Sequence, residues 1–202
     1  MASEEATRII DLYQRKASDW IESRARTRLV EKPWLDRFRA LLPPAAPIID
    51  IGCGAAAPMA AYLVELGHPV VGVDSSRAMI DACRRHFPAQ EWIVADMRKL
   101  ALPRTFSGIL AWDSFFHLCH DDQRNMFPVF RAHASPQAAL MFTSGPAHGE
   151  AIGSFAGEPL YHASLDAAEY RSLLDRNGFR VVSHVVKDPG CGGHTIWLAQ
   201  FI

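Results

Sequence analysis

The hydrophobic and polar positions divide most of the chain into short apolar runs that alternate with helical segments. From residue 47 onward this alternation is typical of βαβ units, in which a parallel sheet has both faces covered. The apolar runs predict strands over residues 47–51, 69–73, 91–95, 107–112 and 138–143. The segments between them predict helices over residues 57–66, 76–86 and 121–134.

The N-terminal part precedes this alternating region and has a helical pattern. It predicts two helices, over residues 5–23 and 31–42. The second helix should end before Pro43, Pro44 and Pro47, because proline lacks an amide hydrogen and disfavours helix before it.

The C-terminal part breaks the alternation. A predicted helix over residues 166–177, ended by an Asn-Gly pair, is followed by two strands in succession, over 179–187 and 194–201. The connection over residues 188–193 is short and rich in turn-forming residues. We therefore expect these strands to pair antiparallel as a hairpin at the edge of the sheet.

Residues 144–163 fit neither a helix nor a strand. They contain four glycines and two prolines together with Phe155, Tyr161 and two histidines. Long insertions of this kind in compact domains are often lids or binding loops. We expect an unstructured cover over a substrate here.

Composition and charge narrow the function. The 202 residues are 49% hydrophobic and 21% charged, which suits one folded α/β domain. The 21 basic and 22 acidic residues give a net charge of −1, which supplies no electrostatic footprint for nucleic acid or an anionic membrane. A small-molecule partner is favoured, and we expect a monomer or a homodimer.

Cysteines, histidines and the N-terminus indicate a reduced, metal-free protein. The four cysteines contain no C-x-x-C pair, and the nine histidines show no metal-site spacing. No apolar run approaches the roughly 20 residues that span a bilayer, and the N-terminus is too charged for a signal peptide. We expect a cytoplasmic protein without a metal.

A glycine turn follows the first predicted strand of the alternating region. Gly52 and Gly54 allow a sharp turn and a close approach of the backbone to a ligand. Twenty residues after Gly54, the second strand ends in Asp74, where a carboxylate can accept both hydroxyls of a ribose. This order of strand, glycine turn, helix, strand and acidic residue predicts nucleoside binding.

The glycine turn alone does not decide which nucleoside ligand binds. Gly52-x-Gly54-x-x-Ala57 also satisfies the dinucleotide pattern of an NAD-dependent oxidoreductase. Asp50 argues against that alternative, because a carboxylate beside the helix N-terminus repels a pyrophosphate and favours a cationic amino or sulfonium group. Asp96 follows the third strand, where an adenine amino group can be met. A noncatalytic protein that only binds the cofactor is a further alternative.

Four segments together resemble the class I S-adenosylmethionine-dependent methyltransferases, particularly small bacterial proteins with type 11 or type 25 methyltransferase domains. They are IIDIGCGAAAP, VVGVDSS, VADMRKL and ILAWDSFFHL, and the resemblance covers roughly residues 34–202. It implies a Rossmann-like three-layer sandwich with a mostly parallel seven-stranded sheet of order 3-2-1-4-5-7-6, the last strand antiparallel. Residues 1–45 would form a helical cover and residues 46–202 the cofactor-binding domain. The family usually has a third glycine at the position of Ala56.

The resemblance also implies a set of cofactor-binding residues for S-adenosylmethionine. The ribose would bind at Asp74 with Ser75 beside it, and the adenine at Asp96 and Met97. Tyr13 and Trp20 would pack in the helical cover and wall the cofactor. The methionine portion would be held by Asp50, Gly52, Gly54, Trp112 and Asp113.

The acceptor side is predicted from histidines and aromatic residues. His117 follows the fourth strand at the ligand edge and is the candidate general base for an oxygen or nitrogen acceptor, which such a base suits better than carbon. His194, at the start of the last strand, is either structural or reaches the pocket. The candidate substrate-binding residues are Phe116, His148, Tyr161 and His162.

Overall fold

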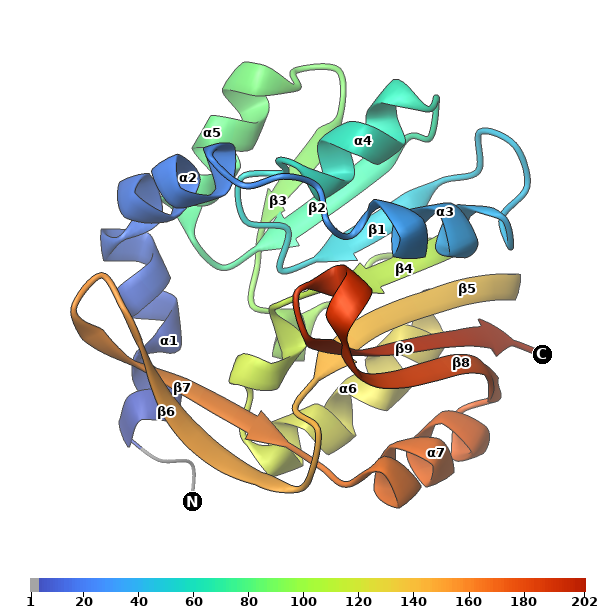
Figure 1. The fold of residues 1–202 in the computed structure, drawn as a ribbon. Coiled ribbons are helices and arrows are strands. Elements are labelled where there is room, and N and C mark those ends of the chain that lie inside the picture. The colour runs from blue at the N-terminus through green and yellow to red at the C-terminus, as the bar shows by residue number, and fades with distance from the viewer. Residues whose placement is uncertain (1–3) are drawn as a thin grey trace.

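The computed structural model describes residues 4–202 and contains a seven-stranded sheet. Its order is β3-β2-β1-β4-β5-β9-β8 (Figure 1), which confirms the predicted order 3-2-1-4-5-7-6. Strands β3 to β5 pair in parallel, whereas β9 is antiparallel to both neighbours. The strands are β1 (Ile48–Ile51), β2 (Val70–Asp74), β3 (Glu91–Val94), β4 (Phe106–Ala111), β5 (Ala134–Ser144), β8 (Phe179–Asp188) and β9 (His194–Phe201).

Helices cover both faces of this sheet. They are α1 (Glu4–Arg15), α2 (Ala17–Ala25), α3 (Lys32–Arg39), α4 (Met59–Glu65), α5 (Arg77–His86), α6 (His120–Ala132) and α7 (Ala167–Arg176). Three short 3₁₀ turns are η1 (Met97–Lys99), η2 (Phe115–His117) and η3 (Pro189–Cys191). Within residues 4–202, no helix has the length and apolar character needed to cross a membrane.

The side chains of the central strands alternate between the two faces of the sheet, and this explains why the protein has a hydrophobic core on each face. Ile49 of β1 packs in the core formed with α6 and α7, whereas Ile48 packs in the core formed with α3, α4 and α5. Successive side chains of a strand point to opposite faces, so a strand that is apolar throughout needs cover on both sides. The β1 sequence IIDI is buried at all four positions. Its Asp50 is therefore a charge-bearing side chain inside the sandwich.

The prediction of an unstructured segment over residues 144–163 is wrong. Strand β5 extends to Ser144, and β6 (Gly149–Phe155) and β7 (Glu158–Ser164) form an antiparallel hairpin outside the main sheet. Ala156 and Gly157 both have positive φ and form a two-residue turn that suits a tight hairpin. The glycines of β6 weaken its strand signal, and pairing with β7 supplies the order that the local sequence lacks.

The N-terminal helices also differ from the prediction. The single helix predicted over residues 5–23 is two helices, α1 and α2, which meet at Lys16 with φ −102° and ψ 19°. This break lets Tyr13 and Trp20 pack edge to face, with ring centroids 5.6 Å apart. Residues 1–3 of the predicted cover lie outside the described part of the chain.

The hairpin and α1 lie side by side (Figure 1). Phe155 of β6 stacks on Tyr13, with centroids 6.0 Å apart, and the guanidinium of Arg15 donates two hydrogen bonds to Glu158 of β7. Segments some 140 residues apart in the sequence thus form one joint cover near the carboxyl ends of the central strands.

Candidate active site

A cavity opens at the carboxyl ends of β1 to β4, with α1 and α2 forming its opposite wall. This is the edge at which open parallel sheets bind ligands, because the chain reverses its winding direction there. All the residues predicted to bind the cofactor line it, together with the candidate base. They are Asp50, Gly52, Gly54, Asp74, Ser75, Asp96, Met97, Trp112, Asp113 and His117.

The carboxylate of Asp74 holds the turn after β1 in place. Its Oδ2 accepts a hydrogen bond from the amide of Gly54 at 2.9 Å, and its Oδ1 accepts one from the amide of Ser76 at 2.8 Å. Burial raises the pKa of Asp74, while the amides of Ser76 and Gly54 oppose that rise by stabilising the ionised form. One carboxylate therefore ties the glycine turn to the start of α5.

The glycines of the turn serve the protein's own packing. Gly52 has φ +79°, and a Cβ there would lie 2.2 Å from Cβ of Ser114. Gly54 has φ +53°, and a Cβ there would lie 3.1 Å from Nε1 of Trp20. The sequence predicts a close approach of a ligand at these positions, and in the structure the side chains of Ser114 and Trp20 occupy the space. Ala56 has φ +69°, so the turn keeps a left-handed backbone where the family usually has glycine.

Asp50 is a buried carboxyl in the cavity wall. Its side chain is 5% exposed, and burial together with the negative charge of Asp74 raises its pKa to about 7. A carboxyl in this setting is stabilised in its charged form by a nearby cation. The wall therefore suits a ligand that carries an ammonium or sulfonium group.

Asp113 lies at the end of β4, where the chain has φ +46°. Its amide donates to Oγ1 of Thr143, and its Oδ2 lies 3.0 Å from Nε2 of His194. The hydrogen bond to Asp113 raises the pKa of His194 to about 9, so this imidazole is protonated at neutral pH. His194 is thus the ion-pair partner of a wall residue, a role that the sequence pattern did not settle.

Trp112, beside Asp113, is buried with 5% exposure. In the part of the chain that the structure describes, its indole Nε1 has no hydrogen-bond partner. A buried donor without a partner is costly and is satisfied when a ligand supplies an acceptor. This orphaned donor, the buried Asp50 and the strand-end Asp74 fit a nucleoside ligand that has an amino acid portion.

Asp96 and Arg98 form the wall at the end of β3. The guanidinium of Arg98 donates to both carboxylate oxygens of Asp96, and Nη1 of Arg98 also reaches Asp122 at 3.2 Å. Burial alone would raise the pKa of Asp96, but the Arg98 pair lowers it below its ordinary value. Asp96 is therefore an ionised, oriented carboxylate at the place predicted for adenine.

His117 is buried between α1 and the hairpin. Its Nδ1 lies 2.7 Å from the carbonyl oxygen of Tyr161, and its Nε2 lies 2.9 Å from the hydroxyl of Tyr13. Burial lowers its pKa to about 4, so the ring is neutral at pH 7. The candidate base is in the wall, and both its nitrogens already have partners.

The sequence matches known methyltransferases in its central part. Residues 48–137 match the family model of a methyltransferase domain. A trans-aconitate 2-methyltransferase of Azoarcus sp. (strain BH72) is 43% identical over 104 residues, which are 50% of this chain and 40% of that protein. These matches make residues 48–137 similar to a methyltransferase domain. It aligns with only about two fifths of the length of this curated relative.

Solved structures of methyltransferases share the fold. The 1,6-didemethyltoxoflavin-N1-methyltransferase of Burkholderia thailandensis, solved with its substrate and S-adenosylhomocysteine, has TM-score 0.77 and 19% identity over 100% of this chain and 91% of that one. The magnesium protoporphyrin IX methyltransferase of Synechocystis PCC 6803 has TM-score 0.73 and 16% identity over 100% and 99% of the two chains. At these identities the likeness concerns the fold.

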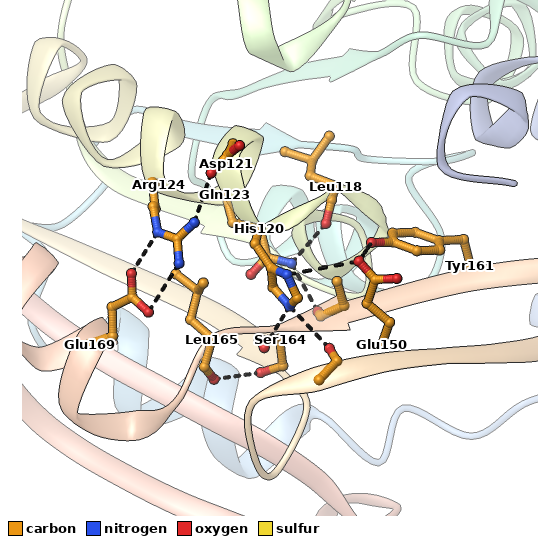
Figure 2. Close-up of polar contacts among 12 residues, drawn as sticks. Leu118, His120, Asp121, Gln123, Arg124, Glu150, Tyr161, Ser164, Leu165 and Glu169 are labelled. Atoms are coloured by element: carbon orange, nitrogen blue, oxygen red, sulfur yellow. Dashed lines mark hydrogen bonds and ion pairs between the residues drawn. The ribbon is translucent and has the colours of Figure 1, made fainter. Parts of the chain in front are cut away.

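The predicted substrate-binding residues lie apart from the main cavity. Phe116, His148 and His162 line a second cavity at the base of the hairpin, and the side chain of Tyr161 points to Glu150, to which its hydroxyl donates at 2.7 Å (Figure 2). Near the main cavity, Tyr161 contributes its backbone carbonyl oxygen, which lies within hydrogen-bond distance of Nδ1 of His117. None of these four side chains lines the main cavity, where the predicted cofactor-binding residues lie.

The base of the hairpin is anchored to α6. Nε2 of His120 lies 3.2 Å from the carbonyl oxygen of Gly149 and 3.1 Å from that of Ser164, which face each other at the open end of the hairpin (Figure 2). The amide of Gln123 donates to the carbonyls of Leu118 and Ala163. These contacts fix β7, and with it the carbonyl that holds His117.

The sequence pattern did not predict several residues of the main cavity wall. Ile9 and Ile10 of α1 and Arg24 of α2 line the cavity, and Arg24 donates to the buried carboxylate of Glu31 at 2.9 Å. The apolar positions of α1 form an amphipathic helix whose pattern signals a covered face but not what it covers. In residues 4–202, no cluster of three or more acidic, histidine or cysteine side chains is arranged to hold a metal ion.

Proposed function

We propose that this protein transfers a methyl group from S-adenosylmethionine to an oxygen or nitrogen of a small molecule. The observation that carries the proposal is a pair of carboxyls in one cavity: Asp74 at the end of β2, which accepts a hydrogen bond from the glycine turn, and the buried Asp50 of β1. In this proposal Asp74 accepts the ribose hydroxyls, Asp50 faces the cationic portion, and Asp96 with Met97 flanks the adenine. When bound, S-adenosylmethionine supplies a methyl carbon that is already activated by a positively charged sulfur.

The cover formed by α1, α2 and the hairpin supports the same proposal. Its helices α1 and α2 line the cavity opposite the sheet and contribute Tyr13 and Trp20 to the wall, and the hairpin packs on α1 through Phe155 and Glu158. Excluding water and aligning the acceptor are the main tasks of a protein in a one-step displacement, because alignment can contribute several kcal/mol, on the order of 7–11 at best. We propose that residues 4–45 act as this cover and residues 46–202 as the cofactor-binding domain.

The acceptor is proposed to be a neutral or carboxylic small molecule. The acidic cavity and the net charge of −1 give no patch that would hold nucleic acid. The name of the Azoarcus relative makes trans-aconitate the first acceptor to test. A hydroxyl or an amine loses a proton on methylation, which gives the neutral His117 a role as base for those acceptors, whereas a carboxylate oxygen is already ionised and needs no base.

The test begins with calorimetric titration of the protein with S-adenosylhomocysteine and, separately, with NAD. We expect micromolar or tighter binding of S-adenosylhomocysteine and none of NAD; the reverse result would establish a dinucleotide enzyme. Transfer of labelled methyl from S-adenosylmethionine is then measured with trans-aconitate and a panel of carboxylic acids, phenols and amines. Binding without transfer to any acceptor would favour the noncatalytic alternative.

A further inference from the structure

The hydrogen bonds of His117 determine where its proton lies. A carbonyl oxygen only accepts, so Nδ1, 2.7 Å from the carbonyl of Tyr161, carries the hydrogen. In the neutral ring Nε2 is then the acceptor, and the hydroxyl of Tyr13 donates to it at 2.9 Å. No nitrogen of His117 is left to meet an acceptor molecule directly. The next atom along this chain of hydrogen bonds is the oxygen of Tyr13.

Tyr13 belongs to the cavity wall. It lines the same cavity as Asp50, Asp74 and His117. Its ring packs edge to face with Trp20, with centroids 5.6 Å apart, stacks on Phe155 at 6.0 Å and lies against the tilted ring of His117 at 5.4 Å. Three neighbours on different elements therefore fix the direction of its hydroxyl, as a catalytic group requires.

We propose that Tyr13 is a catalytic residue: its oxygen takes the proton of the acceptor while its own proton passes to Nε2 of His117. This inference rests on the proposed methyl transfer. A bond forms between the acceptor oxygen or nitrogen and the methyl carbon, and the carbon–sulfur bond breaks with its electron pair left on sulfur. The acceptor proton ends, through Tyr13, as the second proton of the His117 ring, which solvent removes after turnover. Tyr161 positions the ring through its carbonyl.

The electrostatic surroundings suit such a relay. Burial raises the pKa of Tyr13, with Asp113 and Asp74 adding to the rise, and burial keeps His117 neutral with a pKa of about 4. The charged or titratable groups that face His117 are Tyr13 on α1, His162 on β7 and Asp113 after β4. A neutral pair avoids a buried charge before reaction, and the acceptor becomes strongly acidic as its new bond forms, so a weak base suffices.

The first experiment determines the tautomer and protonation state of the His117 ring in the absence of an acceptor molecule. Long-range ¹H–¹⁵N spectra of the protein saturated with S-adenosylhomocysteine at pH 7 should show a neutral ring with the hydrogen on Nδ1. Tyr13→Phe should shift the Nε2 resonance and keep the tautomer. The control is Tyr62→Phe, which removes a hydroxyl that donates a hydrogen bond to Asp36 away from the cavity. It should leave the Nε2 resonance and the tautomer of His117 unchanged. A ring with the hydrogen on Nε2, or an imidazolium, would overturn the relay.

The second experiment measures turnover with the best hydroxyl or amine acceptor of the panel, because a carboxylate such as trans-aconitate carries no proton for the relay to remove at neutral pH. Tyr13→Phe and His117→Gln should each lower kcat about 100-fold or more, with the Kd of S-adenosylhomocysteine within about 3-fold of wild type. The double variant should be no slower than the slower single variant, because the two groups act as one unit. If the wild type is active and Tyr13→Phe keeps its kcat, the relay is overturned but the proposed function is not. The same holds if the losses in kcat of the two single variants multiply in the double variant. A wild type that methylates no acceptor would overturn the proposed function as well.

Discussion

Nε2 of His194 lies 3.0 Å from Oδ2 of Asp113, and this contact joins the start of β9 to the carboxyl end of β4. Nδ1 of the same ring lies 2.6 Å from the carbonyl oxygen of Cys191. Both ring nitrogens therefore face acceptors, which matches a protonated imidazole with a pKa of about 9. The pair lies beside Trp112, whose ring centroid is 5.3 Å from that of His194.

This ion pair makes the stability of the protein depend on pH. The folded-state pKa of about 9 lies above the ordinary value of 6.5, so the stabilisation is fully present below about pH 6.5 and is lost as the pH rises through 9. The side chains are 25% and 22% exposed, so solvent screening reduces the effect to roughly 1 kcal/mol. Urea unfolding of wild type and His194→Gln should show a difference that shrinks between pH 6 and pH 10. Asp113→Asn should remove the same dependence, and a pH-independent difference would contradict the pair.

Asp74→Asn should weaken the binding of S-adenosylhomocysteine by about 100-fold or more. The carboxylate orders the glycine turn through Gly54 and Ser76, and hydrogen bonds to a charged acceptor contribute roughly 1.5–3 kcal/mol each. Calorimetric titration measures the loss. The matched control is Asp81→Asn on the exposed face of α5, where the carboxylate pairs with Arg84 and binding should not change. Undiminished binding by Asp74→Asn would remove Asp74 from the ribose site.

Asp50 should make cofactor binding depend on pH. A bound cation favours the ionised carboxyl, so binding releases a proton where Asp50 is protonated in the free protein, below its pKa of about 7. The Kd of S-adenosylmethionine should therefore rise as the pH falls from 8 to 5.5.

Asp50→Asn provides the control for this pH dependence. It should flatten the profile and weaken binding at pH 8. The same variant should stabilise the unliganded protein at pH 8 by roughly 1–2 kcal/mol, because it removes a desolvated charge. A profile that keeps its slope in Asp50→Asn would show that another group is responsible.

Gly52→Ala should destabilise the fold by roughly 2–4 kcal/mol. The backbone at Gly52 has φ +79°, and the new Cβ would lie 2.2 Å from Cβ of Ser114, so strain and overpacking add together. Thermal unfolding of the unliganded protein measures the change. Gly67→Ala, also at positive φ but with open space around the new Cβ, should cost about 1 kcal/mol from backbone strain alone. Equal losses in the two variants would argue against the Ser114 contact.

The pattern of apolar and turn-forming residues along the chain predicted the strands of the main sheet. Apolar runs bounded by turns predicted all seven strands of the main sheet, and the turn-rich link over residues 188–193 predicted that the last two pair antiparallel. These features depend on side-chain period and turn chemistry, which neighbours along the chain decide. The acidic positions at strand ends, such as Asp74, also followed from the sequence, because parallel strands bring their carboxyl ends to one edge.

The hairpin of β6 and β7 shows where local patterns fail. Its glycines and prolines indicate a loop, yet pairing across the Ala156–Gly157 turn and the anchor at His120 order it. The space beside Gly52 and Gly54 is likewise filled by side chains from distant segments, Ser114 and Trp20. Nothing near these glycines in the sequence distinguishes a ligand from a packed side chain.

By itself, then, the sequence determined the strands of the main sheet and the edge at which the carboxylates gather, since these depend on residues close together in the chain, whereas the strand order came from the resemblance to a known family. Only the tertiary structure decided that Tyr13 meets His117 and that Asp113 meets His194, pairs separated by 104 and 81 positions. A protonation state depends on burial and on the groups within a few ångströms, and those neighbours exist only once the cover has folded over the sheet.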